Sequence, residues 1–238
     1  MTTYESFETA KNKSISPEAP LDFELPREVI FPEKKATDEP PKLENISNLQ
    51  QIILLIQCLE LWWSNRNDFY AASNLTIHYS ERQLKPEELP SPDFFVALNV
   101  ERKPRQSWVI WQEDGIYPHI IIELLTEQRA SSNQELRKQI YQNTFRTPEY
   151  FLFDPSNFEL AGFILMGGTY QPIQVNEQGW LWSQQLNLYL GVHRQQLRYF
   201  TPEGLIILTP EEFAQQEKQK AERLAAKLRE LGVDPDTI

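Results

Sequence analysis

Hydrophobic residues recur at helical spacing between Leu49 and Trp63. Ser47 and Gln50 form a capping-box pattern directly before this stretch, which is typical of a helix N-terminus. We therefore expect ordered structure to begin at Ser47, with a helix that packs through a broad apolar face.

Short apolar runs follow, with the composition of strands rather than of helices. Residues 69–79 hold β-branched and aromatic side chains in partial alternation, which predicts a strand. Further strands are expected at residues 93–98, 107–111 and 120–125, each bounded by Pro, Gly or charged loop residues.

A second helix is predicted from Ser132 to about Phe145. Its apolar residues Leu136, Ile140 and Phe145 are expected to face inward. The opposite, polar side is expected to present four side chains: Asn133, Arg137, Lys138 and Tyr141.

The last hundred residues read as strands followed by one helix. A buried strand is expected at residues 150–153, then hairpins up to about residue 200, the first of them turning at Gly167 and Gly168. Thr209, Pro210 and Glu212 predict the start of a final helix. This order of elements predicts an α/β or α+β fold with a mixed sheet flanked by helices, plus a C-terminal helix.

The apolar residues of that final helix follow a 3-4-3 spacing, at Ala221, Leu224, Leu228 and Leu231. This spacing suits a short coiled-coil seam, and so a homodimer, but it is shorter than the heptad runs of established coiled coils. Packing of the helix on its own domain is the alternative.

Three regions follow from these patterns. Residues 1–46 are polar and acidic and carry six of the 17 prolines, so we expect a disordered tail. Residues 47–208 form the expected folded domain, and residues 209–238 the expected C-terminal helix.

Composition narrows the class of protein. The formal net charge of −11 opposes bulk attraction to phosphate, so nucleic-acid binding has to be argued from a local site. A single cysteine, Cys58, leaves no disulfide framework. The first residues lack the pattern of a signal peptide, and no apolar run approaches the roughly 20 residues of a membrane span. We therefore expect a cytoplasmic protein without a membrane partner.

Two acidic residues lie at strand-like apolar runs: Asp93 at the head of one, and Glu123 inside another. A charge in such a run is costly to desolvate unless it is paired, hydrogen-bonded or bound to a metal. These two carboxylates could share one divalent cation. The alternatives are a turn or cap role for Asp93 and an edge-strand or ion-paired role for Glu123.

A Pro-Asp strand, an acid within a second apolar strand and a helix with basic residues together resemble the PD-(D/E)xK nuclease superfamily, and within it the Uma-type restriction endonucleases common in cyanobacteria. The resemblance spans about Ser47 to Ile238. It rests on these segments: Ser91-Pro92-Asp93-Phe94-Phe95-Val96, Ile121-Ile122-Glu123-Leu124-Leu125, Lys138-Gln139-Ile140-Tyr141, Arg146-Thr147-Pro148-Glu149-Tyr150 and Gly179-Trp180-Leu181-Trp182-Ser183.

The resemblance implies an endonuclease that hydrolyses phosphodiester bonds of DNA with Mg²⁺ or Mn²⁺. It assigns Asp93, Glu123 and the backbone carbonyl of Leu124 as metal ligands, and Lys138 or Arg137 as the basic group near the scissile phosphate. Glu60, on the first helix, is a candidate further acid.

The chain departs from the pattern of that family at four positions. Leu125 stands where the wider superfamily has lysine, and His119 where Uma-type relatives commonly have aspartate. Asn133 and Arg137 replace an Asp and a Lys on the helix, and arginine is a poor proton carrier because it stays protonated. A non-catalytic protein of nuclease fold, acting as a binding or assembly module, is therefore the alternative function.

Three further charges and one histidine remain open. Arg102, Lys103 and Arg105 follow the Asp93 strand, where they could contact phosphates or lie in a solvated loop. His119 could be a metal ligand or a structural residue. The sequence does not decide between DNA and RNA, or which nucleotide sequence would be recognised.

Overall fold

The computed structural model describes residues 43–80, 90–125 and 131–234. The first helix, α1, spans Leu43–Trp62, so the predicted start at Ser47 is too late and Ser47 lies exposed inside the helix rather than at its cap. The reason is visible in the sequence, because Leu43, Ile46 and Leu49 extend the helical spacing of apolar residues toward the N-terminus. The rest of the predicted tail, residues 1–42, lies outside the described residues.

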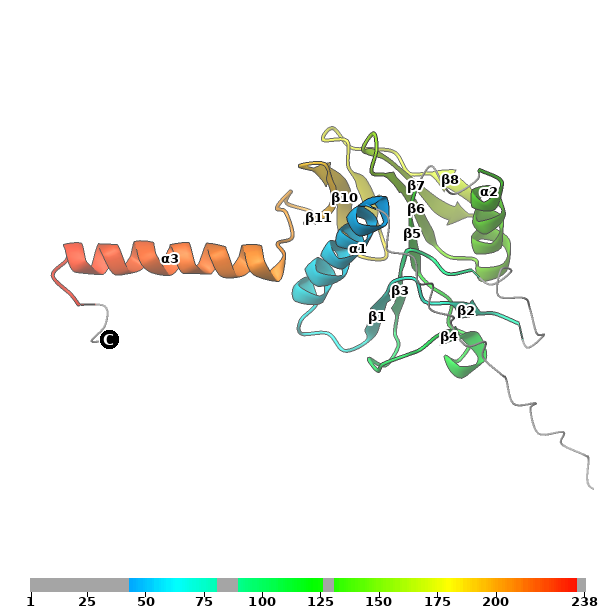
Figure 1. Cartoon of the computed structure of the whole chain (residues 1–238), viewed down its shortest axis with the longest axis horizontal. Helices are drawn as coiled ribbons and strands as arrows, with labels where there is room; N and C mark the ends of the chain where they lie inside the picture. The colour runs from blue at the N-terminus through cyan, green and yellow to red at the C-terminus, as the bar shows by residue number, and fades with distance from the viewer. Residues whose placement is uncertain (1–42, 81–89, 126–130, 235–238) are drawn as a thin grey trace, which may run out of the picture. The chain divides into compact units, whose positions relative to one another are not determined.

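A six-stranded mixed sheet forms the centre of the fold, in the order β1-β3-β5-β6-β7-β8 (Figure 1). Neighbouring strands pair antiparallel except β5 and β6, which are parallel. The strand bounds are Phe69–Ala72 for β1, Phe94–Leu98 for β3, Ile120–Leu124 for β5, Glu149–Asp154 for β6, Glu159–Met166 for β7 and Thr169–Pro172 for β8. The predicted mixed sheet flanked by helices is therefore confirmed.

The two faces of this sheet belong to two separate hydrophobic cores. On one face, Phe94 and Ile122 lie in a cluster with the buried side of α1. On the other, Phe95 and Ile121 lie in a cluster with Tyr141, which follows the helix α2 (Ser131–Gln139). Successive strand residues point to opposite faces, so the alternation of the sequence decides which core each residue joins.

Two of the predicted strands are shorter than expected. The segment 69–79 divides into β1 and β2 (Ile77–His78), and Asn74 between them has a φ of 49° that no strand adopts. The segment 107–111 forms β4 (Trp108–Val109), parallel to β2, and then turns into the 3₁₀ helix Ile110–Gln112. Trp108, Val109 and Ile110 are all buried, so this segment lacks the inward and outward alternation of a longer strand.

The second helix, α2, spans Ser131–Gln139 and continues as a π-helix over Ile140–Phe145. The predicted inward face is wrong in part, because Leu136 is 57% exposed while Tyr141 is fully buried. Residues four apart lie on one side of a helix, so Arg137, Tyr141 and Phe145 share a side, and it is this side that faces the sheet. Leu136 belongs to a neighbouring side that stays exposed.

A three-stranded antiparallel sheet, β9-β10-β11, completes the first core beside α1. Its strands are Leu181–Ser183, Leu188–His193 and Gln196–Phe200. Before it, the predicted Gly167–Gly168 turn is confirmed: both glycines have positive φ, and Met166 pairs with Thr169.

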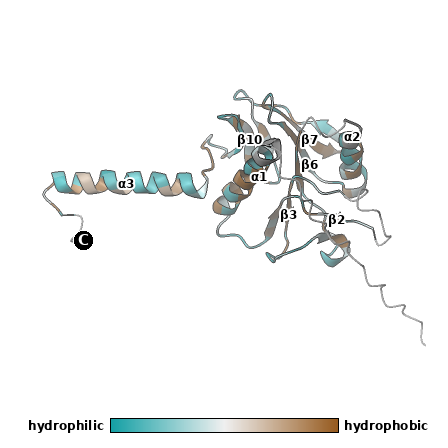
Figure 2. Cartoon of the chain, in the orientation of Figure 1, coloured by the Kyte–Doolittle hydropathy of each residue, from teal (hydrophilic) through white to brown (hydrophobic). Residues whose placement is uncertain are grey.

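The last helix, α3, spans Pro210–Glu230, so its predicted start is confirmed, and Thr209 and Glu212 form a capping box there. None of its residues is buried, and Leu224 and Leu231 are 58% and 70% exposed. In Figure 2 most of α3 has the colour of hydrophilic residues, with hydrophobic ones at intervals. The packing of its apolar seam on its own domain is therefore not observed, and dimerisation through that seam stays a prediction. Among the described residues, no helix is long and apolar enough to cross a membrane.

Candidate active site at the Asp93 and Glu123 carboxylates

Asp93 and Glu123 lie next to each other at the ends of two paired strands. The register of β3 and β5 pairs Phe94 with Ile122, so Asp93, one residue before β3, comes opposite Glu123. Oδ2 of Asp93 accepts a 2.8 Å hydrogen bond from the backbone N–H of Leu124. Both side chains are buried, with 6% and 3% of their residue surface exposed. Two carboxylates 30 residues apart in sequence therefore meet at one site.

The site is on the face of the sheet that α2 covers. Glu123 shares its strand face with Ile121, and Asp93 shares its own with Phe95, and both of these hydrophobic residues belong to the core beside the π-helix. Ile122 and Leu124 point to the opposite core, which α1 covers. Glu123 thus faces α2, while Ile122 and Leu124, its neighbours in β5, pack in the opposite core.

Two side chains from the α2 segment meet Glu123 at the same oxygen. Nη1 of Arg137 donates to Oε1 of Glu123 at 2.8 Å, and the hydroxyl of Tyr141 donates to the same atom at 2.7 Å. Nη1 of Arg137 also lies 3.3 Å from the carbonyl oxygen of Ser91, two residues before Asp93. Arg137 therefore links the segments that carry the two acids.

The charges of this cluster reinforce one another. Burial alone would lower the pKa of Arg137, but its interactions with Glu123, Tyr141 and Asp93 together outweigh burial, and the pKa of Arg137 is raised. Burial, with the negative charge of Glu123 beside it, raises the pKa of Tyr141 well above its ordinary value. Arg137 stays a cation and Tyr141 stays a neutral donor at physiological pH.

Lys138 lies apart from this cluster. Its ammonium is 4.0 Å from the centre of the Phe163 ring on β7, a cation–π contact. A helical step of about 100° separates it from Arg137, which explains why one basic side chain reaches Glu123 and the next does not. Of the two basic residues in the sequence prediction, the structure brings only Arg137 to the acids.

The other positions named from the sequence fall in different places. Leu125, half-buried, donates its backbone N–H to the carbonyl of Phe153 at 2.8 Å. Asn133 lies in the first part of α2. His119 accepts a 3.1 Å hydrogen bond from the N–H of Leu98 through Nδ1, and burial lowers its pKa. This bond gives His119 a structural partner on β3.

Glu60 lies on α1, which packs on the opposite face of the sheet from the two acids. Its carboxylate forms an ion pair with Arg102, whose guanidinium lies 4.9 Å from the Phe69 ring. The structure therefore does not bring Glu60 to Asp93 and Glu123.

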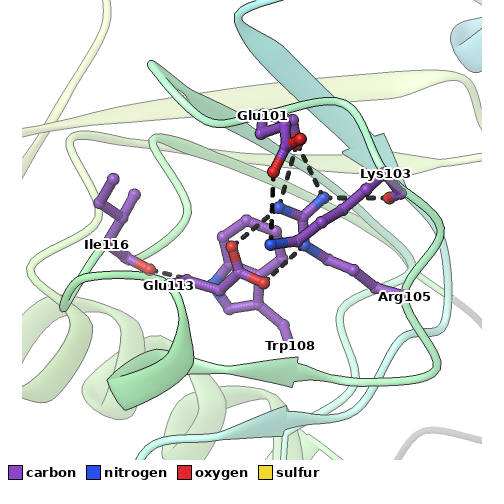
Figure 3. A network of polar contacts seen from close by, with 6 residues as sticks. All are labelled: Glu101, Lys103, Arg105, Trp108, Glu113 and Ile116. Atoms are coloured by element: carbon purple, nitrogen blue, oxygen red, sulfur yellow. Dashed lines mark hydrogen bonds and ion pairs between the residues drawn. The ribbon is translucent and has the colours of Figure 1, made fainter.

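Arg105 is bound within its own loop (Figure 3). Its guanidinium pairs with both carboxylate oxygens of Glu113, at 2.6 and 2.8 Å, and donates to the carbonyls of Glu101 and Lys103 at 3.1 Å. Its side chain is only 4% exposed and lies over the Trp108 ring at 4.8 Å. Arg105 therefore braces the loop, and its hydrogen bonds with Glu113 lower the pKa of that carboxyl.

Tyr141 is the site residue that the sequence reading misplaced. It was expected on the polar side of the helix, yet it is fully buried against Glu123. The four-residue spacing of Arg137, Tyr141 and Phe145 was the available signal, because residues four apart lie on one side of a helix.

The oxygen atoms at this site fit a small, hard cation. Mg²⁺ is usually held by one or two carboxylates and keeps several of its waters. Asp93, Glu123 and the carbonyl of Leu124 supply oxygen ligands of that kind. Among the described residues, no group of three or more His, Cys, Asp or Glu side chains is placed to hold a metal ion.

Comparisons with known proteins identify the family to which the chain belongs. A family model described as "Putative restriction endonuclease", Uma2, matches residues 38–197. Among solved structures, the chain resembles a "putative nuclease belonging to DUF820 from Anabaena variabilis", with a TM-score of 0.43 and 12% identity over 59% of this chain and 72% of that one. A comparison with curated proteins found no match. Because the family model covers more than half of the chain, the protein belongs to the Uma2 family of restriction-endonuclease-like proteins.

Proposed function

We propose that this protein is an endonuclease that hydrolyses phosphodiester bonds of DNA with Mg²⁺ or Mn²⁺ at Asp93 and Glu123. The observation that carries the proposal is the convergence of these two buried carboxylates from neighbouring strands on one face of the sheet. Membership of a family described as restriction endonucleases supports DNA as the substrate.

The residues of the site would divide the work as follows. Asp93 and Glu123, with the carbonyl of Leu124, would hold the cation, which supplies charge neutralisation at the phosphate and lowers the pKa of an attacking water. The Leu124 N–H orients Asp93, and the Tyr141 hydroxyl orients Glu123. Fixed orientation of this kind keeps ligands in place without reorganisation during the reaction.

Arg137 is the cationic group closest to the acids. Its pKa is raised, so it does not serve as a general base. Its planar guanidinium instead suits a phosphate oxygen, which arginine can bind through two parallel hydrogen bonds. We assign it to the scissile phosphate, and we leave Lys138, held over Phe163, as a candidate for contact with a neighbouring phosphate.

One observation favours the second candidate, a non-catalytic binding protein of the same fold. Glu123 already receives both Arg137 and Tyr141 on one oxygen, so its charge is balanced within the protein. A carboxylate paired in this way also serves a purely structural role.

The test is cleavage of supercoiled plasmid and of single-stranded DNA, with Mg²⁺, with Mn²⁺ and with EDTA. We would compare the full chain with Asp93→Asn and Glu123→Gln, which preserve side-chain shape and remove one charge each. Asp114→Asn is the matched control, because Asp114 is exposed and its φ of 52° suits asparagine equally well.

We expect cation-dependent nicking by the wild type and by Asp114→Asn, and a loss of at least about a hundredfold in the two site variants. Equal activity in all four proteins would indicate a contaminant and overturn the proposal. No activity in any of them, with both DNA forms and both cations, would favour the binding protein.

A further inference from the structure

Arg137 is bound to Glu123 through a single hydrogen-bonded contact. The ion pair is short, at 2.8 Å, and the carboxylate is 4% exposed. The arginine side chain, however, is 26% exposed, and all of its hydrogen bonds to described residues come from Nη1. Among the described residues, Nη1 is thus the only guanidinium nitrogen of Arg137 with a hydrogen bond, and the side chain is partly open to solvent.

A second buried arginine shows what a permanent structural ion pair looks like in this protein. Arg105 is 4% exposed, binds both oxygens of Glu113 through two nitrogens and lies over two aromatic rings. Arg137 is 26% exposed and, among the described residues, makes one hydrogen bond to Glu123 and lies over no aromatic ring. Arg105 is therefore fixed at Glu113, whereas Arg137 can leave Glu123 by losing fewer contacts.

We propose that Arg137 is a latch: it neutralises Glu123 while the site holds no cation, and it leaves that carboxylate when a divalent cation binds there. The inference rests on the proposed function, because it takes Asp93 and Glu123 as the ligands. It adds a regulatory step, in which the arginine becomes available for substrate phosphate only at a loaded site.

Electrostatics makes the two cations compete. A guanidinium 2.8 Å from a buried carboxylate is held in a medium of low dielectric, where a second positive charge at the same oxygens is repelled strongly. Arg137 is therefore displaced more readily than it is shared. Tyr141 is neutral and fully buried, so it keeps Glu123 in place during the exchange.

The released guanidinium has a defined use. Once Arg137 leaves Glu123, its fork of N–H groups can pair with a phosphate oxygen pair. The helix that carries it need not move, because the long side chain alone can swing outward. Loading of the site and recognition of phosphate are thereby coupled through one residue.

The experiment measures cation binding rather than cleavage. Isothermal titration of the full chain with Mn²⁺ and with Mg²⁺ compares wild type, Arg137→Gln, Lys138→Gln and Asp93→Asn. Lys138→Gln is the matched control, because it removes the same charge from the next residue, whose ammonium lies over Phe163 instead of at Glu123. We expect Arg137→Gln to bind about tenfold more tightly than wild type, Lys138→Gln to stay within about twofold and Asp93→Asn to lose binding.

Two results would overturn the latch while leaving the cation site intact: equal affinity in wild type and Arg137→Gln, or the same gain in Lys138→Gln as in Arg137→Gln. Absence of binding in every protein would overturn the latch and the cation site together. A cleaving enzyme with equal affinities would contradict the latch alone.

A second measurement uses the wild type and needs no stable Arg137→Gln protein. The guanidinium ¹⁵N resonances of Arg137, assigned from the spectrum of Arg137→Lys, should shift on addition of Mg²⁺, while those of Arg105 stay in place. Unchanged Arg137 resonances at saturating Mg²⁺ would overturn the proposal.

Discussion

The hydroxyl of Tyr141 donates a 2.7 Å hydrogen bond to Oε1 of Glu123, across 18 residues of sequence. Both groups are buried, so neither can exchange this bond for one to water at no cost. The bond ties the π-helical turn after α2 to the middle of the sheet. It thus connects an unusual local geometry to the position of a candidate ligand.

Replacement of Tyr141 by phenylalanine should lower the free energy of unfolding by about 2 kcal/mol, because it removes a hydrogen bond to a buried charged acceptor. Urea unfolding followed by circular dichroism measures the change. Phenylalanine keeps the ring, so loss of packing contributes little.

Tyr150→Phe is the control for this prediction. Tyr150 is fully buried in the same core, but its hydroxyl has no hydrogen-bond partner among the described residues. Removing that hydroxyl should leave stability unchanged or raise it. If Tyr150→Phe destabilised the protein as much as Tyr141→Phe, the hydrogen bond to Glu123 would not explain the effect.

The order of helices and strands along the chain, and the positions of the two acids at strands, could be predicted from the sequence, since both depend on local patterns. The run of apolar residues around Glu123 is that of a buried strand, and an acid inside it required a partner. Asp93 was singled out in the same way. The pairing of β3 with β5, which brings the two together, is a long-range contact that the resemblance implied and the local pattern did not determine.

The side of α2 that packs on the sheet could not be predicted from local patterns. Leu136 with Ile140, and Arg137 with Tyr141, each show a four-residue spacing, so the sequence period offers two candidate inward sides. The structure turns the Arg137 side to the sheet, where Tyr141 is buried while Leu136 is exposed. That choice is made by packing against the sheet, which the helical period does not determine. The pairing of Arg105 with Glu113 likewise depends on how the loop between them folds, which the neighbouring residues in the sequence do not determine.

The apolar seam of α3 could be recognised in the sequence, but its partner could not. The same spacing of apolar residues fits packing on a partner helix or on the helix's own domain. In the structure these positions are exposed, so the apolar spacing does not reflect packing on the helix's own domain.

Glu149 should make stability fall as pH rises. It is fully buried, where it accepts hydrogen bonds from Ser183 and from the N–H of Gln184, and burial raises its pKa above 4.5. The folded state then holds the proton more tightly than the unfolded chain, so this residue's contribution is most favourable below pH 4.5 and is lost as pH rises through the raised pKa.

Glu149→Gln isolates that contribution, because the amide can still accept from Gln184 and can donate to Ser183. We expect the variant to gain stability relative to wild type as pH is raised from 4 to 8, measured by urea unfolding at each pH. A difference that stayed constant across this range would show that the carboxyl does not titrate abnormally.

Arg105→Lys should destabilise the protein by about 2 kcal/mol, although the charge is retained. Lysine cannot bind both oxygens of Glu113 and cannot lie flat over the Tyr70 and Trp108 rings. Arg102→Lys is the control, because Arg102 is 40% exposed in its ion pair with Glu60 and should cost less than about 0.5 kcal/mol. Equal losses in the two variants, by thermal unfolding, would contradict the bracing role of Arg105.

Glu212 attaches the first turn of α3 to the domain, and its removal tests how that helix is held. Its carboxylate receives Nη1 and Nη2 of the buried Arg198 at 3.0 and 2.6 Å and the N–H of Thr209 at 2.9 Å. The hydrogen bonds from Arg198 lower the pKa of Glu212 to about 2. The stabilisation is therefore present above about pH 4.5 and is lost as pH falls toward 2.

Glu212→Gln should cost about 1–3 kcal/mol at pH 7, because it leaves the buried Arg198 charge without its carboxylate, while the glutamine side chain can keep the capping box. Amide exchange should accelerate at the N-terminal turn of α3. Glu211→Gln removes the same charge from an exposed neighbour outside this network and should cost little. The two variants should also converge as pH falls, since protonation of Glu212 in the wild type removes the same charge. Persistence of the full difference at pH 2 would mean that loss of shape, and not loss of the ion pair, causes the destabilisation.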